Sequence, residues 1–354
     1  MSPFIYQSNP SRVVFGPGKL DVLADEIARL GARRAFVLST PEQSADAGRL
    51  VQRIGNLACG SFSGARMHTP VDVTLAAMAE VETSGADCLV AIGGGSTIGL
   101  GKAIALRTDL PQIAIPTTYA GSEATPIVGQ TEHGIKTTQT TPRVLPEVIV
   151  YDVLLTTGLP VAISVVSGMN AIAHAVEGLY SEQANPIISL VAQEGIRALA
   201  GALPRIKSAP LDIAARSDAL YGAWLCGTTL GAVGMALHHK LCHTLGGTFD
   251  LPHAQTHAVI LPHALAYNAP YARDAIVRIE AALGRPGAAA ALHDLAVTLG
   301  APTSLRELGM PRDGLARVVE LTMAKPYWNP APLDENRLRQ MLERAWEGLP
   351  PAMD

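Results

Sequence analysis

Histidine is the residue whose placement in this chain first suggests chemistry. Six of the ten histidines lie in one stretch, residues 234–263, GMALHHKLCHTLGGTFDLPHAQTHAVILPH. A neutral imidazole binds divalent metals, and near neutral pH the same group donates and accepts protons. A histidine cluster of this density indicates either a metal site or a catalytic centre that transfers protons.

The spacing of three of these histidines predicts that they converge. His239 and His243 are four residues apart in an apolar segment, so they share one face of a helix. We expect Gly246 and Gly247 to end this helix and a short turn to bring His253 back towards the other two. Three converging imidazoles can hold a metal, or act as acids and hydrogen-bond donors around a substrate.

The other side chains of this kind are interpreted as structural. His257 and His263 are expected to cap helices or to satisfy buried polar groups. The four cysteines are isolated in the sequence and form no C-x-x-C pair. They predict neither a disulfide framework nor a structural zinc site.

Two different patterns position these residues. Between Val13 and about Tyr151, helical segments alternate with the apolar runs RAFVLS, DCLVAI, QIAIPTT and EVIVYD. Such strands predict a parallel sheet covered on both faces, as in Rossmann-like domains. From Ala162 onward the sequence has helical periodicity and no clear strand. We therefore expect an α/β domain over residues 1–160 and an all-α domain over residues 161–354.

Composition excludes several classes of function. The net charge is -4 and no run of Lys or Arg is present, which argues against nucleic-acid binding. No apolar stretch reaches 18 residues without a polar interruption, and the first residues lack the pattern of a signal peptide. A cytoplasmic protein that does not bind a membrane is expected.

A glycine-rich turn predicts a nucleotide site. The run LVAIGGGSTIGLGKAIAL reads as a strand, a turn and a helix, in which Gly94 and Gly95 let a ligand approach the backbone. The amides of Ser96 and Thr97 open the helix, where a pyrophosphate is favoured. The spacing is neither G-x-G-x-x-G nor a Walker loop, so a purely structural turn remains the alternative.

Further hydroxyl groups follow neighbouring strands. Thr117, Thr118 and Ser122 come after a second strand end and could contact a ribose or phosphate, or could cap a following helix instead. Ser39 ends the first of the predicted strands, where many NAD-binding folds carry an acidic residue. Without that carboxylate, NADPH should be accepted beside NADH.

The chain resembles the iron-containing (group III) alcohol dehydrogenase family. The resemblance is carried, in order, by FGPGK, GGGS with Lys102 after it, PTT with GSE, NAIAH, HxxxHxLGG and PH, and it spans nearly the whole chain. Within the family it is most similar to the maleylacetate reductases, through ARMHTPV, YAGSEATPI and the tail NPAPLDENRLRQMLERAWEG. It implies the dehydroquinate synthase-like fold, with the active site in the cleft between the two domains, and a homodimer.

The departures from the family concern the metal. Its dehydrogenases bind iron or zinc through one Asp and three His, the first two in D-A-x-x-H. Here the segment begins with Asn170, which leaves His174, His239 and His253 as neutral ligands. Gly99 also replaces the acid of the family's GGGS-x-I-D motif. We expect no bound metal, as in the maleylacetate reductases that the chain resembles.

The resemblance also implies a substrate and roles for the site residues. The substrate would be 2-maleylacetate, a small dicarboxylate from aromatic compound degradation, reduced at its C=C bond to 3-oxoadipate by NADH or NADPH. His243 is assigned proton transfer. His239 and His253 would steady the enolate and, if protonated, attract the carboxylates. His174 and Asn170 would line the same pocket.

Two carboxylates require cations, and several candidates are available. They are Lys240, Lys136, Lys325 with Tyr327, and also His238, His133 and Arg143. Each could equally be a solvated surface group. Two other functions remain open: a metal-dependent alcohol dehydrogenase that tolerates Asn170, acting on a small alcohol or aldehyde, and a non-catalytic nucleotide sensor.

Overall fold

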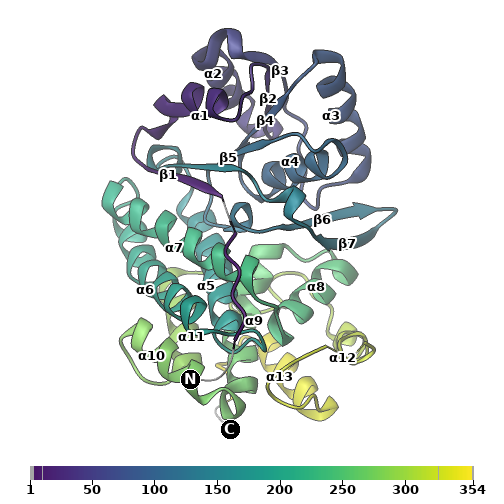
Figure 1. Cartoon of the computed structure of the whole chain (residues 1–354). Coiled ribbons are helices and arrows are strands. Elements are labelled where there is room, and N and C mark those ends of the chain that lie inside the picture. Colours follow the sequence, from purple (N-terminus) through teal and green to yellow (C-terminus); the bar gives the residue numbers. More distant parts are fainter. Residues whose placement is uncertain (1–3, 10, 326, 353–354) are drawn as a thin grey trace. The chain divides into compact units, whose positions relative to one another are not determined.

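The chain forms two compact units (Figure 1). The computed structural model describes residues 4–9, 11–325 and 327–352, apart from the side chains of residues 135 and 136. One unit is Ser8–Leu159, and the other begins at Pro160 and also includes the described residues before Ser8. The first is α/β with a parallel sheet and the second is helical, so the predicted fold class is confirmed.

A six-stranded parallel sheet forms the centre of the α/β unit. In spatial order its strands are β1 (Arg12–Gly16), β8 (Val148–Asp152), β5 (Gln112–Pro116), β4 (Cys88–Gly93), β2 (Ala35–Leu38) and β3 (Ala58–Phe62). Every residue of β2, β4, β5 and β8 is buried, as expected for strands covered on both faces. The covering helices are α1 (Leu23–Arg29), α2 (Ser44–Ile54), α3 (Val71–Ser84) and α4 (Gly95–Thr108), with α1 and α2 on one side and α3 and α4 on the other (Figure 1).

Strands without a long apolar run escape prediction from the sequence. These are β1, β3 and an antiparallel hairpin, β6 (Ile127–Glu132) with β7 (Ile135–Thr140). The sequences ACGSF and IKTTQT carry small or hydroxyl side chains. Their strand structure depends on pairing with neighbours, which periodicity does not reveal.

The second unit consists of helices among its described residues. They are α5 (Val161–Leu179), α6 (Pro186–Ser208), α7 (Ile213–Ala232), α8 (Leu237–Phe249), α9 (His253–Asn268), α10 (Arg273–Leu283), α11 (Ala288–Leu299), α12 (Leu315–Met323) and α13 (Glu335–Glu347). α5 packs against α6, α7 and α9 and is buried from Ser164 to its end. α5 and α6 are long and apolar enough to cross a membrane by length and composition, but 83% of the α5 window is buried inside the fold. Burial in the helical core accounts for the composition of α5.

The end of α8 corrects the sequence analysis. The helix continues through Gly246 and Gly247 and ends at Phe249. Asp250 then adopts a left-handed conformation, with φ of 53°, which an Asp tolerates better than most residues. Two glycines can remain helical when neighbouring packing offsets their low propensity, so the predicted end was three residues early.

Candidate active site

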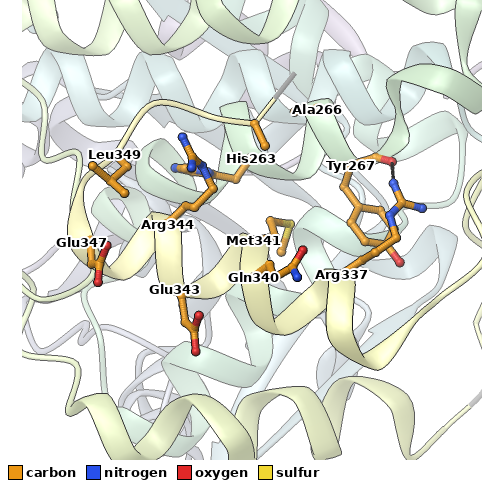
Figure 2. Close-up of a pocket in the computed structure, with 11 residues that line it drawn as sticks. His263, Ala266, Tyr267, Arg337, Gln340, Met341, Glu343, Arg344, Glu347 and Leu349 are labelled. Carbon is orange, nitrogen blue, oxygen red and sulfur yellow. Dashed lines mark hydrogen bonds between the residues drawn. The ribbon is translucent and has the colours of Figure 1, made fainter. Parts of the chain in front are cut away.

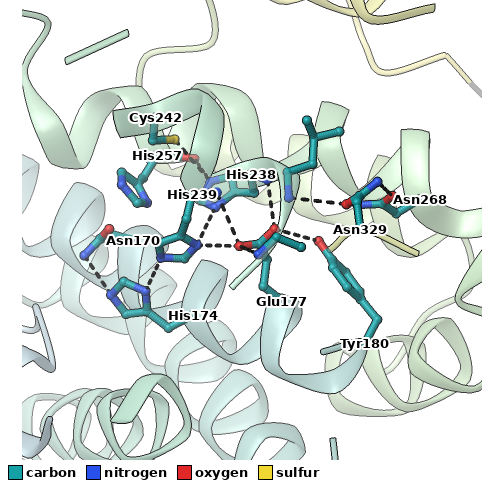
Figure 3. Close-up of polar contacts among 12 residues, drawn as sticks. Asn170, His174, Glu177, Tyr180, His238, His239, Cys242, His257, Asn268 and Asn329 are labelled. Atoms are coloured by element: carbon teal, nitrogen blue, oxygen red, sulfur yellow. Dashed lines mark hydrogen bonds and ion pairs between the residues drawn. The ribbon is translucent and has the colours of Figure 1, made fainter. Parts of the chain in front are cut away.

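Three helices bring the histidines together (Figure 3). α5 contributes one face, because its polar residues at 170, 174 and 177 are spaced by four and three positions. α8 and α9 pack against each other, and α9 also packs against α5. The resulting imidazole cluster consists of His174, His238, His239, His243, His253 and His257.

A chain of hydrogen bonds runs through the buried part of this cluster. Asn170 Nδ2 lies 3.3 Å from His174 Nε2, and His174 Nδ1 lies 2.8 Å from His239 Nε2. His239 Nδ1 lies 2.6 Å from an oxygen of Glu177. All four residues are at most 6% exposed. The structure thus brings together three predicted site residues and a carboxylate that the sequence analysis missed.

Glu177 is the only Asp, Glu, Lys or Arg in α5 and is fully buried. Its carboxylate accepts hydrogen bonds from the backbone N–H groups of Ala236, His238 and His239, at the start of α8. Burial raises the pKa of this carboxyl, and His238 and the backbone donors oppose that shift. A lone acid in an otherwise apolar helix, one turn after His174, is the signal that could have identified it.

His238 and His257 belong to the cluster as well. His238 Nε2 donates to the carbonyl of His257 at 3.1 Å, and the His257 ring lies 4.2 Å from that of His253, centroid to centroid. Both ring nitrogens of His257 are buried with no hydrogen-bond partner among the described residues. His257 therefore satisfies no polar group through its ring, which contradicts the interpretation from the sequence.

Burial keeps these imidazoles neutral. It is the largest cause that lowers the pKa of His238 to about 4 and that of His239 to about 3. For His257, burial and then the neighbouring His253 hold the pKa well below its usual value. A neutral His239 would not attract a substrate carboxylate by charge, so that part of its predicted role loses support.

His243 is the exposed member of the cluster. Its ring centroid is 6.2 Å from that of His239 and 6.4 Å from that of the half-buried His253. His239, His243 and His253 were predicted to converge, and the structure places them near one another. Exposure is what a group that exchanges protons with a substrate requires.

His263 lies apart from the cluster, on the wall of a different cavity of about 350 Å³ (Figure 2). Arg337 and Arg344 also line this cavity. Burial is the main cause that lowers the pKa of His263 to about 3, and His293 and Arg344 add to it. His263 Nε2 is buried and has no hydrogen-bond partner in the part of the chain that is described.

The predicted carboxylate-binding residues are dispersed. Lys240 Nζ lies 5.8 Å from the ring centroid of Tyr327, whose buried hydroxyl finds no hydrogen-bond partner within the described ranges. Lys325 is exposed. Arg143 forms an ion pair with Asp109 at 3.2 Å. The remaining candidates give little support: His133 is exposed, His238 is fully buried, and the side chain of Lys136 lies outside the described residues.

A divalent metal would meet mostly neutral nitrogen donors in this cluster. Ring nitrogens of His238, His239 and His257 all lie within 4.8 Å of one another, close enough for a shared ion. However, His239 Nε2 faces His174 Nδ1, and only this contact competes with an ion, because a carboxylate such as Glu177 on Nδ1 is also found behind metal-bound histidines. The four family ligand positions offer only neutral groups, and the nearby carboxylate of Glu177 is bonded to a ring nitrogen instead. Such a donor set suits hydrogen bonds better than a doubly charged ion.

The glycine turn of the α/β unit has features of a phosphate site. Gly94 is the N-cap of α4, and no side chain caps this helix. A Cβ atom at Gly94 would lie 2.9 Å from Thr118 Cγ2. The hydroxyls of Thr97 and Ser122 are buried and have no hydrogen-bond partner among residues that the structure describes. Unpartnered donors beside an uncapped helix N-terminus fit the pyrophosphate of a dinucleotide.

The other predicted cofactor residues differ in availability. Gly95 is exposed and Ser96 is half-buried, at the start of α4. Thr117 Oγ1 accepts a hydrogen bond from Gln43 at 2.9 Å. Ser39 is fully buried, and its hydroxyl bonds to Ser63 Oγ at 2.9 Å. Ser39 therefore does not present its hydroxyl to a ribose in this conformation.

A buried lysine, Lys102, holds the loop that carries Ser122. The sequence motifs alone did not explain this residue. Lys102 is 1% exposed, and its Nζ donates to the carbonyls of Ser122 and Thr125 at 2.6 Å and of Ile127 at 3.0 Å. Burial lowers the pKa of this ammonium to about 7, and Glu123 opposes the shift. Lys102 thereby fixes the loop that carries Ser122 beside the glycine turn.

At Gly99, where the family motif has an acid, a neighbouring side chain occupies the space that a larger residue would need. A Cβ atom at Gly99 would collide with Thr69 Oγ1. Thr69 and His68 both have positive φ angles, of 47° and 65°, which are uncommon for residues other than glycine. The segment ARMHTPV thus fills the space that a longer side chain at 99 would need.

Comparisons with known proteins give one consistent result. The family model described as iron-containing alcohol dehydrogenase matches residues 10–153, and the C-terminal model of the Fe-containing alcohol dehydrogenase family matches residues 164–346. A protein named maleylacetate reductase from Rhizobium sp. (strain MTP-10005) is 57% identical over 99% of this chain and 100% of its own length. One from Burkholderia cepacia is 54% identical with the same coverage. A crystal structure of maleylacetate reductase from Agrobacterium tumefaciens has a TM-score of 0.96 at 58% identity and covers 99% of this chain and 100% of that one.

Proposed function

Because the chain belongs to the iron-containing alcohol dehydrogenase family, as its motifs predicted, we propose that it is a maleylacetate reductase. The observation that carries this proposal is the identity of more than half of all residues, over the whole chain, with proteins of that name. The chain is an oxidoreductase that depends on NAD(P), as the family does. Its substrate is 2-maleylacetate and its product 3-oxoadipate, within aromatic compound degradation.

The reaction adds one hydride, which carries two electrons, and one proton to an alkene conjugated to a ketone. When bound, NADH or NADPH would supply the hydride for the carbon β to the ketone. The electrons move to the ketone oxygen as an enolate, and a proton then reaches the α-carbon. The glycine turn with Gly94, the hydroxyls of Thr97 and Ser122, and Thr118 are assigned to the cofactor because they offer open donors beside a helix N-terminus.

The helical unit supplies the polar groups for the substrate. His243 delivers the proton, a role that its exposure supports. His253, the half-buried neighbour of His243, donates to the developing oxyanion. His239, His174 and the amide of Asn170 shape the pocket behind them.

The substrate carboxylates are assigned to two lysines. Lys240 carries an ammonium beside the unpartnered hydroxyl of Tyr327, and together they can bind one carboxylate. Lys325 is exposed two residues before Tyr327 and is assigned the second. The lowered pKa of His239, caused first by burial, argues against a charged imidazole in this task.

Four further features belong to the proposal. Catalysis proceeds without a metal, for which the neutral ligand positions and the contact between His239 Nε2 and His174 are the support. NADPH is accepted beside NADH. The chain forms a homodimer and works in the cytoplasm. Light scattering of the purified protein tests the dimer, and initial rates with each nucleotide test the second point.

The central experiment is a steady-state assay of NADH oxidation with the full chain purified without chelators. We expect rapid oxidation with maleylacetate, little with small aldehydes, and less than stoichiometric Fe or Zn by elemental analysis of the same sample. One equivalent of tightly held metal would remove the metal-free mechanism. Preference for simple aldehydes would remove the substrate assignment.

The second candidate is a metal-dependent alcohol dehydrogenase, favoured by the close approach of His238, His239 and His257. This reading predicts that added Fe²⁺ or Zn²⁺ stimulates oxidation of small alcohols. We expect no stimulation, because an ion at this point would have to break the hydrogen bond between His239 and His174.

A further inference from the structure

We propose that Glu177 is a positioning residue that makes the buried hydrogen bonds run one way, from Asn170 through His174 and His239 to its own carboxylate. By doing so it sets which nitrogen of each imidazole carries hydrogen and fixes the start of α8. The inference about hydrogen placement needs no substrate. Only its effect on turnover rests on the proposed function.

The first step is the state of Glu177 itself. Backbone N–H groups donate to it from Ala236 at 3.1 Å, His238 at 2.8 Å and His239 at 3.3 Å. The hydroxyl of Tyr180 approaches as a fourth donor at 3.5 Å. A carboxyl proton would face these donors, whereas an ionised carboxylate accepts from all of them. Burial raises the pKa of Glu177, but these donors oppose that shift and favour the charged form.

The second step follows from that charge. His239 Nδ1 lies 2.6 Å from a carboxylate oxygen, so it must carry the hydrogen. In a neutral ring His239 Nε2 is then an acceptor, and its neighbour at 2.8 Å, His174 Nδ1, must be the donor. His174 Nε2 is in turn an acceptor and receives the amide of Asn170, whose Nδ2 lies 3.3 Å away. Both imidazoles, whose contacts are drawn in Figure 3, thus carry hydrogen on Nδ1.

Without Glu177, the hydrogen bonds among Asn170, His174 and His239 could run in the opposite direction. Asn170 Oδ1 is buried and has no hydrogen-bond partner among the described residues, so a rotated amide could accept from His174 Nε2. His174 and His239 could then exchange donor and acceptor roles. Only Glu177 is an acceptor in every arrangement. It is the group that decides between the two directions.

Glu177 also positions catalytic groups on α8 without touching substrate. The three N–H groups that it holds, at the N-cap and in the first turn of α8, precede Lys240 by at most four residues and His243 by four to seven. These N–H groups are among the first of the helix and have no intrahelical carbonyl to bond. A carboxylate at this end also opposes the positive end of the helix dipole. Loss of its charge should therefore displace His243 as well as reverse the imidazoles.

The direct test is nitrogen NMR of the intact protein with ¹⁵N-labelled histidine. The ring nitrogen shifts report which nitrogen of each neutral imidazole is protonated, and His174→Gln and His239→Gln variants assign the signals. We expect both residues to be neutral and protonated on Nδ1. Protonation of either residue on Nε2, or a doubly protonated ring at neutral pH, would overturn the proposal.

The second test is the variant Glu177→Gln, with Glu182→Gln as the control. Glu182 is an exposed acid just beyond α5. In Glu177→Gln we expect kcat for maleylacetate to fall by about 10- to 100-fold, the range typical of residues that orient an active-site group. KM for NADH should stay nearly unchanged, and Glu177→Asp should recover part of kcat, while Glu182→Gln keeps it.

Several outcomes separate the possibilities. An unchanged kcat in folded Glu177→Gln would overturn the positioning role. If Glu177→Gln does not fold, the NMR result on the unaltered chain decides. If the unaltered chain does not reduce maleylacetate, the proposed function fails, whereas Nδ1 protonation of both histidines would still support the assignment to Glu177.

Discussion

The two candidate sites satisfy their polar groups in opposite ways. At the glycine turn, the buried hydroxyls of Thr97 and Ser122 have no hydrogen-bond partner among the described residues, and no side chain caps α4. In the imidazole cluster, His174 and His239 use all their ring nitrogens on Asn170, on each other and on Glu177. One region, the open site, leaves two buried hydroxyls without a partner, and the other, the closed network, satisfies the ring nitrogens of His174 and His239 internally.

This difference separates two ways of building a site. An open site gains its hydrogen bonds only when the ligand arrives, so the cost of the unsatisfied groups is repaid on binding. A closed network holds its geometry without a ligand and can orient a neighbouring reactive group such as His243. A metal would require the second region to be open like the first. The predictions that follow alter one region at a time.

The largest effect is expected at His243, the exposed histidine beside the closed network. Replacement of His243 with Ala should lower kcat for maleylacetate by about 100-fold or more, because it removes the proposed proton donor. The control is Thr244→Ala, one position along α8, whose hydroxyl bonds only to the carbonyl of Lys240 among the contacts described. Steady-state kinetics of both variants measure the difference. Equal kcat values would exclude His243 from proton transfer.

A smaller effect is expected when a side chain is added at the glycine turn of the open site. In Gly94→Ala the added Cβ would meet Thr118 Cγ2 at 2.9 Å and crowd the backbone that a pyrophosphate approaches. We expect Kd for NADH to rise by about tenfold, equivalent to about 1.4 kcal/mol. Gly48→Ala is the matched control, because Gly48 is exposed in α2 with open space around it. Fluorescence titration with NADH measures Kd for both variants. Equal Kd values would contradict the prediction.

The open site was easier to predict from the sequence than the closed one. A strand, a run of glycines and a helix occur within one short segment, and the phosphate site depends mainly on that local backbone. The spacing of four residues between His239 and His243 likewise predicted their shared helix face. These features are local, so periodicity is sufficient to find them.

The closed network depends on contacts between distant segments. Glu177 and His239 are 62 residues apart, and no pattern in either segment predicts that α5 meets the first turn of α8. His238 and His257 join the cluster for the same reason, through contacts between α8 and α9. Thr69 closes the space at Gly99 only because its backbone has a positive φ. Tertiary packing, rather than local preference, determines these positions.

The smallest effect concerns His263, which is buried like the cluster but lies outside it. Burial lowers its pKa from 6.5 to about 3 in the folded chain, so below pH 6.5 the unfolded chain takes up a proton that the folded chain does not. Its neutral burial therefore contributes stability that is present above pH 6.5 and is lost as the pH falls towards 3. By pH 5.5 the loss is about 1 kcal/mol.

His263→Leu should remove this part of the pH dependence. Its thermal midpoint should fall less than that of the unaltered chain between pH 7 and pH 5.5, because Leu has no proton to bind. The cluster histidines are present in both proteins, so their contribution cancels in the comparison. An equal fall in both midpoints would mean that His263 is protonated in the folded state. In that case burial alone does not keep an imidazole neutral in this fold, and the neutrality of His239 would have to be attributed to its hydrogen bonds.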